Sequence, residues 1–142
     1  MSNDCVFCKI VSGELPSTKL YEDDDVLAFL DISPAAKGHA LVIPKAHHET
    51  IKDIPAELLG KVSAVVKQIA QALFAGLGAE GVNVGQANGP VAGQVVPHIH
   101  FHVIPRRTDD GLTFAWSHQK YADSAEMQQL AAKITALLTP NT

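Results

Sequence analysis

Hydrophobic residues recur along this chain with two different periods, which predict both helix and strand. From Pro55 to Gly78, apolar residues return every three or four positions and form one apolar face, which is typical of a long helix. Proline suits the first helical position and glycine suits the end, so both ends of this helix are marked. Shorter apolar runs between turn-forming residues predict five strands, at residues 19–22, 26–30, 40–44, 81–86 and 95–104.

Two further helical segments complete the expected elements. A short helical turn is expected at 6–11, with a stop at Gly13, and a weaker helix at about 125–138. One long helix together with hairpin-connected strands indicates the α+β class. The 142 residues show no internal repeat and no shift in composition, so we expect them to form a single domain.

Composition and charge narrow the classes of function. The formal net charge of −4 argues against a nucleic-acid partner, because proteins that bind phosphate backbones usually carry a basic face. No apolar run approaches the roughly 18 residues of a membrane span. The first residues lack the basic and apolar regions of a secretory signal. We therefore expect a cytoplasmic protein with no membrane partner.

Three of the seven histidines, His98, His100 and His102, alternate with apolar residues. On a helix, positions two apart point about 200° away from each other, so the three imidazoles could not act together. On a strand, alternate side chains share one face at a spacing of about 6.6 Å. Ile99 and Phe101 then lie on the opposite face, where they supply the apolar side of a strand packed on a core. The pattern predicts an extended segment with a row of imidazoles.

Such a row favours chemistry at a reactive centre. Imidazole is nucleophilic and largely neutral near pH 7, so three of them can divide attack, proton transfer and orientation. The alternative is a metal-dependent hydrolase in which all three histidines bind one catalytic metal. The preceding glycine-rich loop, 85–94, could offer backbone N–H groups to a phosphate, and Arg106 and Arg107 could add positive charge.

Both cysteines lie in one Cys-x-x-Cys, formed by Cys5 and Cys8. A structural disulfide is not expected in a cytoplasmic chain, which leaves metal ligands, a redox pair or two idle thiols. Two thiolates supply half of a closed tetrahedral zinc site. His47 and His98 are the candidates for the other two ligands, with the adjacent His48 as an alternative to His47.

The run from His98 to Ile104 resembles the His-φ-His-φ-His-φ-φ signature of the histidine triad (HIT) family, where φ is an apolar residue. Gly93-Gln94, Phe29-Leu30-Asp31-Ile32 and the segment from Gly38 to Lys45 also resemble that family, and the N-terminal Cys-x-x-Cys resembles its bacterial members. The likeness covers about residues 4–107 and leaves 108–142 as a C-terminal extension. It implies a half-barrel antiparallel sheet of about five strands with one long helix and a C-terminal helix, assembled as a homodimer.

The resemblance also implies roles for individual residues. His100 matches the nucleophile that forms a covalent nucleotidyl-histidine, and His102 matches the histidine that contacts the phosphate and assists the leaving group. Asp31 matches the carboxylate that binds the ribose hydroxyls. The other expected nucleotide-binding residues are Phe7, Phe29, Ile32, Asn88, Gly93, Gln94 and Val95. Val95 departs from several phosphoramidase relatives, which carry a phosphate-bonding serine there, so only its backbone N–H remains for the phosphate.

In related bacterial proteins, the first histidine of the triad and the histidine after Pro-Lys-x complete a zinc site with the two cysteines. By position these are His98 and His47, so we expect a structural zinc on Cys5, Cys8, His47 and His98, and no organic cofactor. The expected function is hydrolysis or transfer at the α-phosphorus of nucleoside phosphoramidates or dinucleoside polyphosphates, with a purine nucleotide as partner. A nucleotide-binding regulatory protein with vestigial activity is the third hypothesis.

Overall fold

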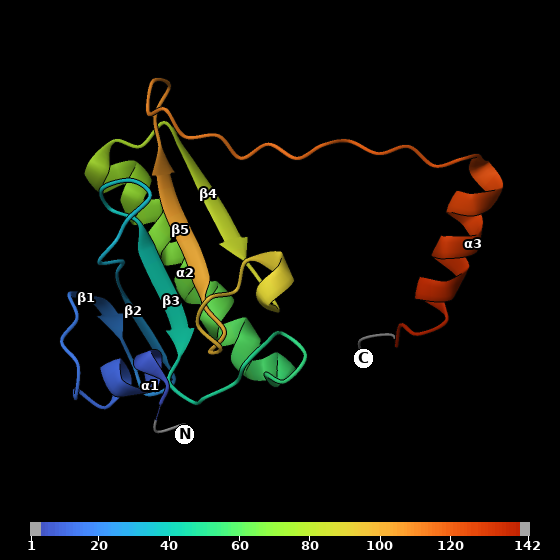
Figure 1. Cartoon of the computed structure of the whole chain (residues 1–142). Helices are drawn as coiled ribbons and strands as arrows, with labels where there is room; N and C mark the ends of the chain where they lie inside the picture. The colour runs from blue at the N-terminus through green and yellow to red at the C-terminus, as the bar shows by residue number, and fades with distance from the viewer. Residues whose placement is uncertain (1–3, 140–142) are drawn as a thin grey trace. The chain divides into compact units, whose positions relative to one another are not determined.

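In the computed structural model, which describes residues 4–139, the chain divides into two units whose boundary lies between Leu112 and Thr113. The first unit contains all elements up to β5, and the second contains α3 (Figure 1). The elements are α1 (Val6–Val11), β1 (Lys19–Glu22), β2 (Val26–Leu30), β3 (Ala40–Pro44), α2 (Ala56–Leu77), β4 (Gly81–Gln86), the 3₁₀ turn η1 (Pro90–Ala92), β5 (Phe101–Arg106) and α3 (Ser124–Thr135).

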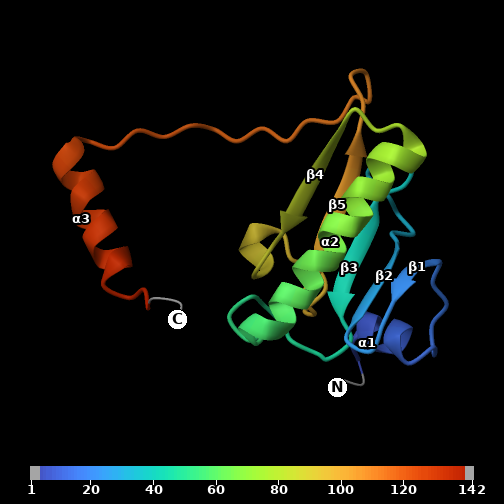
Figure 2. The same ribbon diagram turned by 180° about the vertical axis from the view of Figure 1, so that it is seen from behind.

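The five strands form one antiparallel sheet in the order β1-β2-β3-β5-β4. α2 runs across one face of this sheet, and α1 lies against the other face near its lower edge (Figures 1 and 2). The predicted α+β class and the antiparallel sheet with one long helix are therefore confirmed. β5, which carries the end of the histidine run, lies between β3 and β4.

Alternating side chains of β2 and β3 build a separate core on each face of the sheet. Val26 and Val42 point toward α2, where they pack with Ile99 and Val103 of the histidine segment. The residues of opposite parity pack instead around α1, namely Leu27, Phe29, Leu41 and Ile43 with Cys5, Phe7, Cys8 and Ile10. Burial on both faces explains why these strands read as continuous apolar runs. The pair of strands β2 and β3, beside which the histidine segment lies, is therefore packed on both faces.

The ends of α2 are close to where the sequence places them. Pro55 is the residue before the first helical turn, and Gly78 ends the helix in the left-handed conformation with φ 63°. Arg107 donates hydrogen bonds to the last carbonyls of the helix, at Leu77 and Gly78. α2 is long and apolar enough by composition to cross a membrane, but its buried face packs against strands β2 to β5, as expected for a core helix.

The histidine strand differs from its predicted bounds of 95–104. β5 begins only at Phe101, because Pro97 lacks a donor and the N–H of His98 turns back to the carbonyl of Val96. At the other end the strand continues through Pro105 to Arg106. β3 pairs with β5 only as far as Val103, so the proline lies where one neighbouring strand has already ended.

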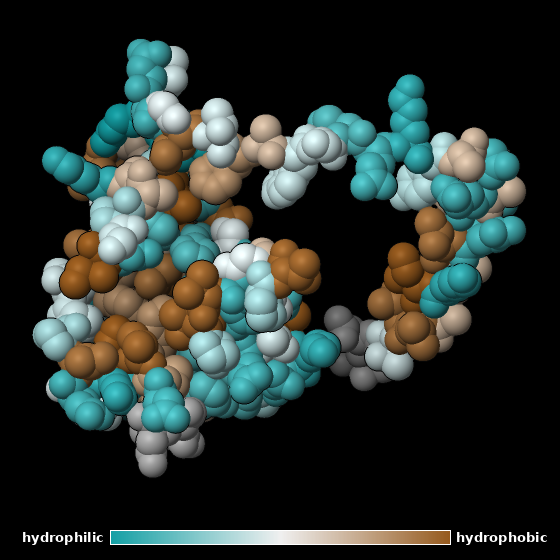
Figure 3. Space-filling model, viewed as in Figure 1, coloured by the Kyte–Doolittle hydropathy of each residue, from teal (hydrophilic) through white to brown (hydrophobic). Residues whose placement is uncertain are grey.

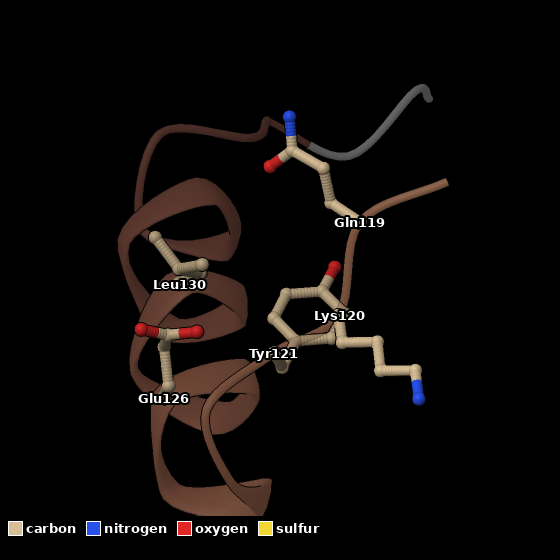
Figure 4. A pocket seen from close by; sticks show the side chains of 5 residues that line it. All are labelled: Gln119, Lys120, Tyr121, Glu126 and Leu130. Atoms are coloured by element: carbon tan, nitrogen blue, oxygen red, sulfur yellow. The ribbon is translucent and has the colours of Figure 1, made fainter. Parts of the chain in front are cut away.

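The second unit consists of an irregular segment and α3, which is shorter than the predicted 125–138. The Asp123 carboxylate accepts a hydrogen bond from the N–H of Glu126, whose carboxylate accepts one from Ala122, and this pair caps the helix. No described residue of α3 is buried, and Met127, Leu130 and Ile134 form an exposed apolar stripe (Figure 3). A shallow pocket of about 370 Å³ separates α3 from the preceding segment, lined by Gln119, Lys120, Tyr121, Glu126 and Leu130 (Figure 4).

Candidate active site and metal centre

The three triad imidazoles keep the alternation that the sequence predicts, although the first two precede the regular strand. Ile99 is buried in the core beneath α2, while the rings of His98 and His100 lie on the opposite face, against Phe7 of α1. The N–H of Ile99 donates to the carbonyl of His48 at 2.7 Å and anchors this irregular segment. The rings of His100 and His102 are 4.9 Å apart between centroids.

His100 is held in an orientation that suits a nucleophile. Its Nδ1 lies 2.8 Å from the backbone carbonyl oxygen of His98, which can only accept, so Nδ1 carries the proton. In the neutral ring the lone pair then resides on Nε2. The Phe7 ring packs edge to face with the His100 ring, at 5.0 Å between centroids, and also restrains the orientation of His100.

His102 belongs to a chain of hydrogen bonds that begins in the backbone. The N–H of Ala35 donates to Nδ1 of His39 at 3.0 Å, so in neutral His39 the proton is on Nε2. That Nε2–H faces Nδ1 of His102 at 2.9 Å and donates to it. Nε2 of His102 consequently carries a proton. His100 thus offers a lone pair beside a ring that offers a donor.

Burial keeps these imidazoles neutral. Loss of solvent contact lowers the pKa of His102 to about 4, assisted by the nearby rings of His100 and His39. Burial likewise lowers the pKa of His100 and that of His39, although the Asp31 carboxylate opposes the shift in both. At pH 7 the nucleophile therefore needs no deprotonation before it can attack.

The expected sugar and base residues lie beside the histidines. Asp31 follows β2 and places one carboxylate oxygen 3.7 Å from Nε2 of His39, while the other accepts a hydrogen bond from the N–H of Ser33. Phe7 and Phe29 are buried and meet edge to face at 5.6 Å. Ile32, by contrast, is 98% exposed. A continuous series of contacts thus connects Phe29, Phe7, His100, His102, His39 and Asp31.

The loop before the histidines is braced by its own amides. Nε2 of Gln94, which is buried, donates to the carbonyls of Glu49 and Val96, and its Oε1 accepts from the N–H of Gly89. The Asn88 amide bonds with Gln86 and accepts from the N–H of Ile51. Gly93 ends η1 with φ 99°, and Val95 is 90% exposed. The hydrogen bonds of these side chains fix the loop, and their contact with a phosphate stays a prediction.

Two sequence expectations about phosphate binding are wrong in detail. Four backbone N–H groups of the glycine loop are consumed inside it, at Gly89, Ala92, Gly93 and Gln94. Arg106 is bound to Asp110, Asn83 and the carbonyl of Leu112, and Arg107 caps α2. Arg106 braces the end of the sheet and Arg107 the end of α2, because their planar forks match the acceptors there.

The second cluster joins Cys5, Cys8, His47 and His98, whose donor atoms all lie within 4.8 Å of one another. Sγ of Cys5 and of Cys8 lie 3.5 and 3.6 Å from Nδ1 of His98, and the two Nδ1 atoms are 3.2 Å apart. A tetrahedral zinc with ordinary bond lengths separates sulfur from nitrogen by about 3.6 Å and two nitrogens by about 3.3 Å. The donor set therefore fits zinc in chemistry and in spacing.

The tautomer of His98 supports the same assignment. Its Nε2 lies 2.9 Å from the carbonyl oxygen of Pro44, so Nε2 carries the proton and Nδ1 is left as the ligand atom. Burial lowers the pKa of His98 to about 4, which keeps the ring neutral. Because Nδ1 of His98 points into the cysteine cluster and Nδ1 of His102 points to His39, the triad does not converge on one metal. The hypothesis of a three-histidine catalytic metal is therefore wrong.

Comparison with known proteins decides the family. The HIT domain matches residues 12–109, which is more than half of the chain. This chain belongs to the HIT family. Among its relatives, the adenosine 5'-monophosphoramidase HNT1 of Saccharomyces cerevisiae is 42% identical over 135 residues, which cover 94% of this chain and 82% of the yeast protein. The family predicted from the histidine run is therefore confirmed.

Solved structures of HIT proteins share the fold over most of their length. A HIT family protein from Bacillus anthracis superposes with a TM-score of 0.91 and 40% identity, covering 98% of this chain and all of that one. A zinc-bound histidine triad family protein from Mycobacterium smegmatis is 41% identical, with a TM-score of 0.75, covering 92% of this chain and 97% of its own.

One residue of this HIT site was missed at the sequence level. His39, which is not among the residues predicted for the site, is buried and connects Asp31 to His102. The signal was present in the strand pairing, because Leu41 is the register partner of His102 and residue 39 shares its face of the sheet. Finding it required knowing that β3 and β5 are neighbours, which the sequence pattern does not state.

Proposed function

We propose that this protein is a nucleotide hydrolase or nucleotidyl transferase that cleaves at the α-phosphorus through a covalent nucleotide on His100. The substrates are nucleoside phosphoramidates or dinucleoside polyphosphates, with a purine base. The observation that carries the proposal is the tautomer of His100, whose Nδ1–H is tied to the His98 carbonyl while Nε2 keeps its lone pair. The phosphoramidase name of the yeast relative supports the substrate class.

In the first step Nε2 of His100 attacks phosphorus, an N–P bond forms, and the bond to the leaving group breaks. The ring becomes cationic, and its Nδ1–H remains bonded to the His98 carbonyl, which stabilises that charge. His102 donates a hydrogen bond from Nε2 to the phosphoryl oxygen or leaving group without losing its proton. A leaving amine departs with the electron pair of the P–N bond and a proton taken up from solvent, and a leaving phosphate departs as its anion.

In the second step water attacks the same phosphorus and the N–P bond breaks. The electron pair of the N–P bond returns to Nε2 of His100, one water proton goes to solvent, and the nucleoside monophosphate is released. Imidazole is a good leaving group from phosphorus, so water can cleave the covalent intermediate. One difficult displacement at phosphorus thus becomes two easier ones. An acceptor other than water would turn hydrolysis into transfer.

The nucleotide is held by residues on the same face. The carboxylate of Asp31 accepts the ribose hydroxyls, and Phe7, Phe29 and Ile32 border the base. A wholly exposed Ile32 on a loop suits contact with a ligand better than contact with the core. Gly93, Gln94, Asn88 and the backbone N–H of Val95 border the phosphate and leaving group.

We also propose that Cys5, Cys8, His47 and His98 hold a structural zinc. The zinc would supply no reaction step, since all four ligands belong to the protein and no position remains for water. It would tie α1 to the histidine segment, because its ligands come from both. The zinc-bound relative from Mycobacterium smegmatis supports this assignment.

The protein is further proposed to be a homodimer that joins through β4. β4 lies at an edge of the sheet and presents six residues without a lysine or proline. Val84 in its centre is 51% exposed. Such an edge is a ready template for a second copy, because natural edge strands are normally blocked by charge or proline.

The experiment is a rate screen over adenosine and guanosine conjugates that differ in leaving group, with the chain and two variants. His100→Ala is expected to abolish turnover of all conjugates, whereas His118→Ala, at an exposed histidine of the second unit, is expected to retain it. Tight nucleotide binding without turnover of any conjugate would instead favour the regulatory-protein hypothesis. Turnover of any conjugate by His100→Ala would refute the proposed mechanism.

A further inference from the structure

The only two cysteines of the sequence both belong to the metal cluster. Neither is in a disulfide, they are three residues apart, and one turn of α1 brings their sulfur atoms within 4.8 Å. Cys-x-x-Cys pairs with this spacing can close into a disulfide. The turn that covers them lies at the surface, since Val6 between the two cysteines is 47% exposed.

Two contacts connect this cluster to the nucleophile. Phe7 lies between the cysteines in sequence, and its ring edge packs on His98 and on His100, at 5.8 and 5.0 Å between centroids. The backbone carbonyl of His98, whose ring is a member of the cluster, accepts the hydrogen bond that sets the His100 tautomer. A change at the cysteines therefore reaches His100 both through the aromatic contact and through the backbone.

We propose that Cys5 and Cys8 are a redox-responsive modification site: a peroxide converts them to a disulfide, releases the metal and lowers the activity of His100. This inference rests on the proposed function for its effect on turnover, but not for the chemistry at sulfur. The two thiolates lose two electrons and an S–S bond forms. The peroxide O–O bond accepts these electrons and two protons from solvent to give two waters, or water and an alcohol. The zinc leaves as the hydrated dication.

The consequence for the site follows from the distances. Closing the S–S bond draws two sulfur atoms that lie within 4.8 Å of each other to about 2.05 Å. This contraction moves Phe7, which lies between the cysteines, against the rings of His98 and His100, and so disturbs the hydrogen bond between His100 and the His98 carbonyl. Disturbing a hydrogen-bonding partner of this kind commonly changes activity by roughly 10- to 100-fold. Reduction with a thiol, followed by zinc, reverses the change.

The test follows four readouts in one titration of the zinc-loaded protein with hydrogen peroxide. A chromogenic chelator measures zinc release, thiol titration counts free cysteines, and intact mass detects the loss of two hydrogens. The fourth readout is turnover of adenosine phosphoramidate together with the ¹⁵N shifts of the His100 ring. Two thiols are expected to disappear for each zinc released, with a roughly 10-fold or larger fall in turnover and full recovery after dithiothreitol and zinc.

Two variants make the result specific. Cys8→His keeps four zinc donors but cannot form the disulfide, so its zinc and its own starting turnover should resist peroxide. Met127→Leu removes an exposed thioether that peroxide also oxidises, and it should respond like the natural chain. Release of zinc with unchanged turnover and unchanged His100 shifts would overturn the coupling. Equal sensitivity of Cys8→His would overturn the assignment to the cysteines. If the untreated protein shows no turnover, the proposed function fails, while zinc, thiols and ring shifts still decide this proposal.

Discussion

The hydrogen bond from His39 to His102 offers the sharpest perturbation of the proposed mechanism. His39 is buried. Its Nδ1 accepts a hydrogen bond from the N–H of Ala35, and its Nε2–H donates one to Nδ1 of His102. His39→Leu removes the donor at similar volume, and His39→Gln can return an N–H to nearly the same point. The variants therefore differ chiefly in whether His102 is held with its proton on Nε2.

The size of the effect follows from the hydrogen bond that is lost. Leaving a buried acceptor without its donor costs about 1–3 kcal/mol. If that loss falls mainly on the transition state, kcat decreases about 5- to 150-fold, since each 1.36 kcal/mol is a factor of ten. His39→Leu is expected in this range, with KM little changed. His39→Gln is expected to recover most of the loss.

The assay measures kcat and KM for adenosine conjugates whose leaving groups span several units of pKa. Loss of the His102 donor should hurt poor leaving groups more than good ones, which a merely structural defect would not do. Thermal unfolding of each variant controls for stability. A folded His39→Leu enzyme within twofold of the natural chain for every leaving group would refute the reasoning about the tautomer.

Three further predictions follow from the cluster, the histidines and the sheet edge. Stripping the metal with a strong chelator should lower Tm by about 10 °C, and Co²⁺ should restore both Tm and turnover; an unchanged Tm contradicts a structural metal. Because burial lowers the pKa of His102 to about 4, below its ordinary 6.5, the unfolded chain takes up the proton first as pH falls. The free energy of unfolding should therefore fall as pH decreases from 6.5 toward 4, by less than about 1.4 kcal/mol per pH unit for this partly buried group. Urea denaturation at a series of pH values should show a smaller fall for His102→Gln than for the natural chain. Val84→Lys should give a monomer in sedimentation, whereas Leu20→Lys at the β1 edge should leave a dimer.

The sequence pattern predicted the strands and the long helix well because their burial is strongly periodic. β2 and β3 are buried on both faces, and α2 places Val62, Val65 and Ile69 on one side, so few alternative structures bury the same residues. The alternation of the histidine run was confirmed for the same reason, since Ile99 and Val103 lock one face into the core. The family and the convergence of the metal ligands were also predictable from motifs of specific spacing.

What the sequence could not predict depends on contacts between distant segments. The late start of β5 follows from two hydrogen bonds, from the His98 N–H to the Val96 carbonyl and from the Ile99 N–H to the His48 carbonyl. Neither bond has a periodic signature in the sequence. The arginines looked available for phosphate because distant partners, Asn83 for Arg106 and the Gly78 carbonyl for Arg107, meet them only in the folded chain. His39 escaped notice because its role depends on which strands are neighbours.

The most direct measurement of the central claim is identification of the atom that carries the covalent nucleotide. Rapid quenching during turnover of an adenosine phosphoramidate, followed by peptide mapping and ³¹P–¹⁵N NMR of the trapped adduct, locates the phosphorus. The account predicts a single adduct on Nε2 of His100, formed at least as fast as turnover and absent from His100→Ala. An adduct on Nδ1 or on another residue, or turnover that oxygen-18 stereochemistry shows to proceed by one inversion, would contradict it.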